Sequence, residues 1–196
     1  MKYLYLDRVS STNTYLKTIK SHLNLSKDVA NDAAKMQTIL DTECMTVMSE
    51  NTTGEDLSKI KEEDKPSAMI IHRYSDTTLQ IPGTSTWGDY WITASGARNV
   101  ANVNKGTPQI TVEEVYKWNP DRIYITNFSS ALPEDLYNNT FQNYDWSNIR
   151  AVKEKNVFKM PLGIYRWYVT NTDSPLTLLW LAKEHHPALF SDINVT

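Results

Sequence analysis

The sequence has little of several features that would point directly to a class of protein. Its 196 residues include a single cysteine, Cys44, so no disulfide can form within the chain. No apolar run approaches the roughly 18 residues that a membrane-spanning helix needs. Acidic residues outnumber basic ones by 23 to 20, and this acidic balance argues against a general nucleic-acid-binding protein. These absences leave an ordinary globular composition.

Enzyme and metal-binding motifs are also scarce. The chain has no G-x-S-x-G, H-E-x-x-H or C-x-x-C motif, so we expect no catalytic residues and no resident cofactor. A metal site needs three or four converging ligands, and only two of the four histidines, His185 and His186, are close in sequence. We therefore expect no metal site, and these two histidines should instead place favourable charge at the end of the last helix.

Strand patterns occur from residue 67 onwards. The apolar runs "SAMIIHRY" at 67–74, "RIYIT" at 122–126 and "NVFKMP" at 156–161 each predict a buried strand. Helical patterns lie between and after these runs. Strands that alternate with helices imply an α/β fold, a three-layer unit with a central, mostly parallel sheet flanked by helices.

The best-specified helix is predicted at 111–118. Thr111 and Glu114 fit the capping box that satisfies free amide groups at a helix start, and Asn119-Pro120 should end the helix. Further helices are predicted at 87–95, from Pro133, and from Ser174, which should cap the last helix ahead of Pro175.

Residues 1–66 have a different pattern. Apolar residues recur at helical spacing over 11–24 and again to about residue 50, which predicts two helices, the second of them long. A charged connection, "ENTTGEDLSKIKEEDKPS", then leads into the first buried strand. We expect a boundary between 1–66 and 67–196.

Segments that follow parallel strands are candidates for a ligand site, because ligands gather beyond the carboxyl ends of the strands in open α/β sheets. The residues at these positions are His72 and Tyr74 at the end of the first strand, Asn127 and Phe128 after the second, and Tyr165, Arg166 and Trp167 after the third.

Arg166 has two alternative roles within its segment. At a shared sheet edge, its planar guanidinium would bind carboxylate or phosphate groups, with the neighbouring aromatics as apolar walls. Alternatively, Trp167 and Tyr168 cover the core while Arg166 pairs with a local acid such as Asp173. The sequence alone does not favour either role.

Three segments carry a resemblance to a known family. "ASGARNVA" at 94–101, "VEEVYKWNPDRIYITN" at 112–127 and the stretch from "WSNIRAVKEKNVFKMP" to "LAKEHHPALF" at 146–190 occur in this order. Together they resemble the C-terminal lobe of substrate-binding proteins of ABC importers, of the iron–siderophore, haem and cobalamin type. Residues 11–66 resemble the linking helix between two lobes and its lead-in.

The resemblance implies a binding protein and no enzyme. It implies that the ligand, an iron chelate such as a siderophore complex or haem, is bound by loops after strands and delivered to permease subunits in the membrane. Glu113, with Glu114 beside it, matches the glutamate that pairs with arginines of the permease in such proteins. The implied ligand-binding residues are His72, Tyr74, Trp87, Asn127, Tyr165, Arg166 and Trp167.

The chain departs from this family because an N-terminal lobe of over a hundred residues normally precedes the linking helix. We expect that lobe to be largely missing here, so that the chain alone binds its ligand weakly and self-associates through uncovered apolar residues. The resemblance implies an extracytoplasmic location for the full-length parent, although "MKYLYLDRVSSTN" has no signal-peptide pattern.

Three alternatives stay open. In the first, the ligand is an oxyanion such as molybdate, or a bare metal ion, bound by the same fold. Less expected is an α/β enzyme in which Arg166 positions an anionic substrate and His72 acts as general base. A third alternative is a degenerate lobe that acts only through protein contacts around Glu113.

Overall fold

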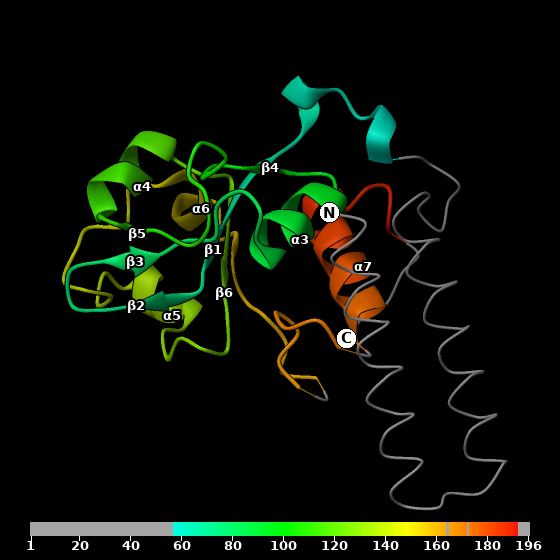
Figure 1. The fold of residues 1–196 in the computed structure, drawn as a ribbon. Helices are drawn as coiled ribbons and strands as arrows, with labels where there is room; N and C mark the ends of the chain where they lie inside the picture. Colours follow the sequence, from blue (N-terminus) through cyan, green and yellow to red (C-terminus); the bar gives the residue numbers. More distant parts are fainter. Residues whose placement is uncertain (1–56, 164, 172, 192–196) are drawn as a thin grey trace, which may run out of the picture. The chain divides into compact units, whose positions relative to one another are not determined.

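A four-stranded parallel sheet forms the centre of the computed structural model, which describes residues 57–163, 165–171 and 173–191 (Figure 1). The strand order is β4-β1-β6-β7, and each neighbouring pair is parallel. The strands are β1 (Ser67–Ile71), β4 (Arg98–Asn99), β6 (Arg122–Ile125) and β7 (Val157–Lys159). The three strands expected from the sequence are therefore confirmed, and they share the central sheet.

Helices cover both faces of this sheet. Alternate residues of β1 and β6 point to opposite faces, so Ile71 and Ile123 pack with one buried cluster and Ile70 and Tyr124 with the other. The first cluster includes side chains of α4 (Val112–Trp118), α5 (Pro133–Tyr137) and α6 (Arg150–Lys153), and the second includes those of α3 (Trp87–Ala94) and α7 (Ser174–His185). Figure 1 shows α3 and α7 on one side of the sheet and the other three helices opposite. The expected three-layer α/β architecture is confirmed.

A small antiparallel sheet was not expected from the sequence. It consists of β2 (Arg73–Tyr74), β3 (Leu79–Gln80) and β5 (Gln109–Ile110). The run at 67–74 is therefore two strands, because the His72 N–H donates to the Gln80 carbonyl at 2.9 Å and the chain turns to pair with β3. Two short 3-10 turns, Leu57–Lys59 and Glu62–Asp64, precede β1.

The ends of α4 agree with the sequence prediction. Thr111 and Glu114 form the capping box, with the Thr111 N–H donating to Glu114 Oε2 at 3.2 Å. Asn119 closes the helix in the left-handed region, with φ of 42°. The chain then passes through Pro120 directly into β6.

Both ends of α7 differ from the prediction. Asp173, and not Ser174, is the N-cap residue. At the other end, His185 is buried and its Nδ1–H donates to the Ser95 carbonyl at 3.1 Å. Burial lowers the pKa of His185 to about 3, and burial also lowers the pKa of His186. Both rings are neutral near pH 7, so the expected charge at the helix end is wrong: their hydrogen bonds join α7 to the end of α3.

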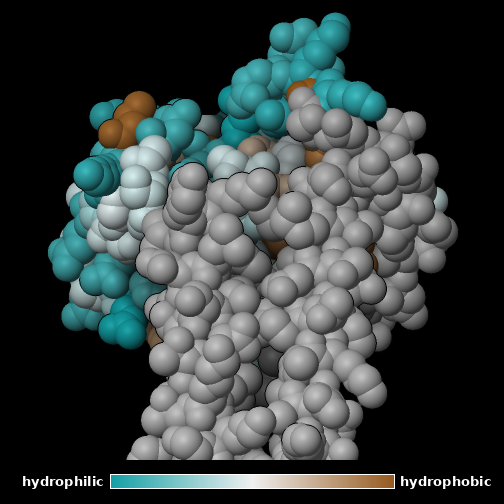
Figure 2. Space-filling model, turned by 45° about the vertical axis from the view of Figure 1, so that its right-hand side comes forward, coloured by the Kyte–Doolittle hydropathy of each residue, from teal (hydrophilic) through white to brown (hydrophobic). Residues whose placement is uncertain are grey.

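The predicted helices within 1–66 and the lone cysteine lie outside the described residues. Within the described part of the chain, no helix has the length and apolar character needed to cross a membrane. On the face shown in Figure 2, the described residues are mostly hydrophilic, with small apolar areas between them.

Candidate functional site

The three segments that follow β1, β6 and β7 meet at one edge of the sheet. Thr126, just after β6, donates its hydroxyl hydrogen to the His72 carbonyl at 2.8 Å, which joins the first two segments. The Met160 N–H, just after β7, donates to the Ile125 carbonyl at 2.9 Å and aligns the third. The carboxyl ends of the strands thus form a continuous rim, the place where ligands bind in open parallel sheets.

Phe128 is the centre of this rim. Its ring centroid lies 5.1 Å from that of His72, 5.5 Å from Cζ of Arg73 and 4.5 Å from Cζ of Arg166. Both guanidiniums are therefore within cation–π distance of one aromatic ring. We call these residues, together with Asn127, the rim cluster: His72, Arg73, Asn127, Phe128 and Arg166.

The rim cluster carries two positive charges, and neither has an acidic partner among the described residues. Among the described residues, no ion pair involves Arg73 or Arg166. The alternative in which Arg166 pairs with Asp173 is therefore wrong: Asp173 Oδ2 instead accepts a hydrogen bond from Trp167 Nε1 at 3.2 Å. Two fork-shaped donors that lack carboxylates suit an anionic ligand.

Two buried polar atoms in the rim cluster also lack a hydrogen-bond partner in the part of the chain that the structure describes. Within the described residues, His72 Nδ1 and Asn127 Oδ1 make no hydrogen bond. Buried polar atoms are usually paired, and unpaired ones gather where water or a ligand binds. Burial, with a smaller contribution from the charge of Arg73, lowers the pKa of His72, so its imidazole is neutral at pH 7. It offers hydrogen bonds without adding charge.

His72 does not have the surroundings of a general base. Its ring packs against Phe128 and against Tyr168, with centroids 4.8 Å apart in the second pair. Burial raises the pKa of Tyr168 to about 12, so this phenol is not a proton acceptor near neutral pH. In the described part of the chain, no carboxylate contacts His72. Among the described residues, His72 therefore has no partner with which it could act as an acid–base pair, as the enzyme alternative requires.

Trp167 lies in the core and not at the rim, which corrects the sequence expectation. Its side chain is 6% exposed and packs edge-on against Trp180, with centroids 6.2 Å apart. Tyr168 is also buried, and its carbonyl accepts a hydrogen bond from Trp91 Nε1 at 2.9 Å. These contacts of Trp167 and Tyr168 anchor the segment in the core. Arg166, with φ of 44°, therefore belongs to an anchored loop.

The other candidates are not part of the rim cluster. Tyr165 is 56% exposed, and its ring lies 5.8 Å from Cζ of Arg166. Tyr74 bonds through its hydroxyl to Ser130 at 2.8 Å, away from Phe128. Trp87 begins α3 and packs against Trp91.

Sequence reasoning missed Arg73 and did not include Phe128 among the binding residues. Phe128 follows β6 directly, so the strand-end rule applied to it as it did to Asn127. Arg73 was hidden because 67–74 was read as one buried strand, in which a charged residue next to the end has no special role. The break at His72 is what brings Arg73 beside Phe128.

Glu113 and Glu114 differ in what they contact. Glu114 is used by the capping box. Glu113 is exposed at the start of α4, and a hydrogen bond from the Thr111 side chain lowers the pKa of its carboxyl. Glu113 is therefore a surface carboxylate that stays charged at neutral pH and is free to meet a basic surface.

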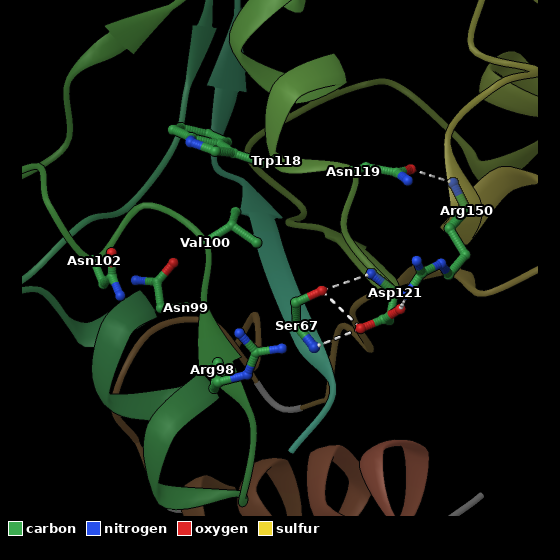
Figure 3. Close-up of a pocket in the computed structure, with 9 residues that line it drawn as sticks. All are labelled: Ser67, Arg98, Asn99, Val100, Asn102, Trp118, Asn119, Asp121 and Arg150. Atoms are coloured by element: carbon green, nitrogen blue, oxygen red, sulfur yellow. Dashed lines mark hydrogen bonds and ion pairs between the residues drawn. The ribbon is translucent and has the colours of Figure 1, made fainter. Parts of the chain in front are cut away.

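A pocket of about 390 Å³ lies at the opposite edge of the sheet (Figure 3). Ser67, at the start of β1, donates its N–H and its hydroxyl to Asp121 Oδ2 at 2.8 and 2.7 Å. Arg150 Nη1 bonds Asp121 Oδ1 at 2.5 Å. Asp121 and Arg150 pair with each other and join β1, β6 and α6, while Arg98, also at this pocket, donates its Nε–H to the Lys65 carbonyl at 3.1 Å. This pocket is at the amino ends of the strands, so we do not assign the ligand site to it.

No group of three or more His, Cys, Asp or Glu side chains converges within the described residues in a way that could hold a metal ion. The expectation of no metal site therefore stays a prediction for the whole chain.

Comparison with known proteins identifies the fold. No protein-family model matches the chain. The chain is 32% identical over 127 residues to the molybdate-binding protein MolA of Haemophilus influenzae, an alignment that covers 61% of this chain and 35% of MolA. It is similar to a periplasmic solute-binding protein from Veillonella parvula, with a TM-score of 0.73 and 28% identity over 84% of this chain and 47% of that one. CeuE of Helicobacter pylori, solved with Ni(II) bound, is similar in fold, with a TM-score of 0.60, 24% identity, and coverage of 91% and 51%.

These similarities confirm the resemblance stated from the sequence. The described residues have the α/β fold of periplasmic solute-binding proteins. The chain spans about half the length of the solved structures, and 35% of the curated relative that it matches.

Proposed function

We propose that the chain is part of a substrate-binding protein of an ABC importer and that the rim cluster is one wall of its site for an anionic solute. The observation that carries this proposal is the pair of guanidiniums, Arg73 and Arg166, which share the ring of Phe128 without an acidic partner among the described residues. An anion is the missing complement to these charges.

The first candidate ligand is an iron chelate, a siderophore complex or haem. Such ligands are large, carry anionic groups and have flat apolar surfaces. Phe128 and the exposed ring of Tyr165 offer aromatic walls beside Arg166, which suits a ligand of this kind.

The second candidate is an oxyanion such as molybdate. It is favoured by the sequence similarity to a protein named for molybdate binding. The neutral His72 and Asn127 would then supply hydrogen bonds to oxygens that the two guanidiniums leave free.

The partners follow from the same proposal. A solute-binding protein of this kind works outside the cytoplasm and delivers its ligand to permease subunits in the membrane. Glu113 is the residue that we propose docks on basic side chains of the permease, because it is exposed and charged, while Glu114 is used in the helix cap.

A titration of the 196-residue chain tests the ligand proposal. Molybdate, a ferric siderophore complex and haem are added in turn, and amide shifts are followed by NMR, which detects millimolar binding. We expect at least one of these ligands to bind, with affinity weaker than micromolar because the chain covers only about half of its relatives. Arg166→Gln should weaken binding about tenfold or more, since hydrogen bonds to charged groups contribute about 1.5–3 kcal/mol.

Arg98→Gln is the matched control. Arg98 is an exposed arginine at the amino edge of the same sheet, so its loss should leave binding unchanged. Equal losses in both variants would show that the anion is attracted by overall charge and not by the rim cluster. Submicromolar binding by the monomeric chain would show that the site is complete without a second wall.

A further inference from the structure

The two arginines of the rim cluster are held close together although their charges repel. Each Cζ lies within 5.5 Å of the same ring centroid, so the two guanidiniums are at most about 10 Å apart. Their like charges repel, and among the described residues no ion pair with a carboxylate offsets this repulsion.

Phe128 is the contact that the two guanidiniums share, and it is itself fixed in place. Its N–H donates to Thr126 Oγ1 at 3.2 Å, and the same hydroxyl donates to the His72 carbonyl. Its ring meets the ring of Tyr168 edge-on, with centroids 6.4 Å apart. Backbone and ring are thus both fixed, and each guanidinium gains a cation–π contact only where the ring places it.

The backbones of both arginines are also fixed. Arg73 pairs with Gln80 across the β2–β3 ladder. The Arg166 carbonyl accepts a hydrogen bond from the Val169 N–H at 2.9 Å, and the loop below it is anchored in the core through Trp167. The guanidiniums therefore have a limited reach, centred on Phe128.

Resting on the function proposed above, we propose that Phe128 is a positioning residue that holds Arg73 and Arg166 as one clamp, and that this clamp selects solutes with two or more negative charges. A doubly charged anion neutralises both guanidiniums and removes their repulsion. A singly charged anion of the same size leaves one positive charge uncompensated. His72 and Asn127 add polarity but no charge, so they do not change this balance.

Tungstate and perrhenate test the clamp directly. They are tetrahedral oxyanions of nearly the same size, but tungstate is doubly and perrhenate singly charged. Each is titrated into the full chain, and the Nε–Hε signals of Arg73 and Arg166 are followed by NMR at constant ionic strength. We expect tungstate to bind at least about tenfold more tightly and to shift both arginine signals together.

Variants of Phe128 separate the role of the ring from general anion attraction. Phe128→Leu keeps an apolar side chain but removes the aromatic face, so most of the preference for tungstate should be lost. Phe128→Tyr keeps the face and should keep the preference. If Phe128→Leu does not fold, Arg73→Gln is measured instead, and it should lose the same preference while perrhenate binding changes little.

Each outcome bears on one level of the proposal. If no anionic ligand, the chelates included, shifts the signals of the rim cluster, the proposed anion site itself is wrong. If tungstate and perrhenate bind equally well at the rim, the site stands and the charge-selecting clamp is wrong. If folded Phe128→Leu keeps the full preference, Phe128 has no positioning role.

Discussion

Gly163 is the residue on which the loop that carries Arg166 depends most. Its φ is 55°, a region that side chains with a Cβ rarely adopt. A Cβ built there would lie 2.1 Å from Trp167 Nε1 and 2.3 Å from Asp173 Oδ2. Gly163→Ala therefore forces apart the two atoms whose hydrogen bond holds the buried indole in place.

The expected loss of stability has two parts. A left-handed alanine costs about 1–2 kcal/mol, and losing a hydrogen bond to a charged group costs about 1.5–3 kcal/mol. The free energy of unfolding should therefore fall by about 2.5–5 kcal/mol in Gly163→Ala. Gly106→Ala is the matched control: φ is 75° there, but no atom lies within 4 Å of the added Cβ. It should lose only the conformational part, about 1–2 kcal/mol.

Chemical denaturation followed by tryptophan fluorescence measures both values, and the extrapolated difference between the variants isolates the clash. Alanine lowers the conformational entropy of the unfolded chain in both variants, so this contribution cancels in the difference. Equal losses in the two variants would refute the anchoring of this loop by Trp167 and Asp173. Where Gly163→Ala stays folded, its anion binding should also be weaker, because Arg166 is no longer held at the rim.

Three further predictions concern other parts of the molecule. Because burial lowers the pKa of His185 to about 3, the unfolded chain binds the extra proton below about pH 6.5, and stability should fall by up to about 1.4 kcal/mol per pH unit as the pH drops further. His185→Asn, which keeps a donor for Ser95, should flatten that dependence in denaturation measured from pH 7 to pH 4; an unchanged slope would contradict the neutral buried ring. Burial raises the pKa of Asp121, but hydrogen bonds from Ser67 and Arg150 outweigh it and lower the pKa overall, so the stability from this group is present above about pH 4 and is lost as the pH falls through the lowered value. Asp121→Asn should weaken this acid-side loss and reduce stability at pH 7 by about 1–3 kcal/mol; equal acid curves would count against the link between β1 and β6. Glu113→Lys should abolish stimulation of the transporter's ATPase with only a small loss of stability from the positive charge at the helix start, whereas Glu114→Ala should lose the capping box, lower stability and leave docking intact; the reverse pattern would show that docking belongs to Glu114.

The layers of the fold could be predicted from the sequence because they rest on local patterns. The run at 68–71 is apolar throughout, as a central strand between two helical layers requires, and the capping box at Thr111 and the stop at Asn119-Pro120 are read within a few residues. The parallel order of the strands then follows from the helices between them.

The predictions that were wrong concern features that depend on contacts between residues far apart in the sequence. The break at His72 is set by pairing with Gln80, which the run at 67–74 does not reveal. The burial of Trp167 depends on Trp180 and Asp173, both outside its own segment. An aromatic residue in a loop beside an arginine looks the same whether it covers the core or faces a ligand.

The candidate site was predictable as a place but not as a set of residues. The strand-end rule selected His72, Asn127 and Arg166, which the structure brings to one rim. It could not select Arg73, because its position beside Phe128 is a consequence of the small antiparallel sheet. The charge of the site, and with it the class of ligand, became visible only when both arginines were seen on one ring.

The most direct test of the account is a map of where an anionic ligand binds on the chain. Amide and arginine signals are assigned, and molybdate and a ferric siderophore complex are added while shift changes are recorded along the sequence. We predict changes at 72–73, 127–128 and 165–166, at the carboxyl ends of the strands. Changes confined to Arg98, Asp121 and Arg150, around the pocket at the amino ends, would contradict it.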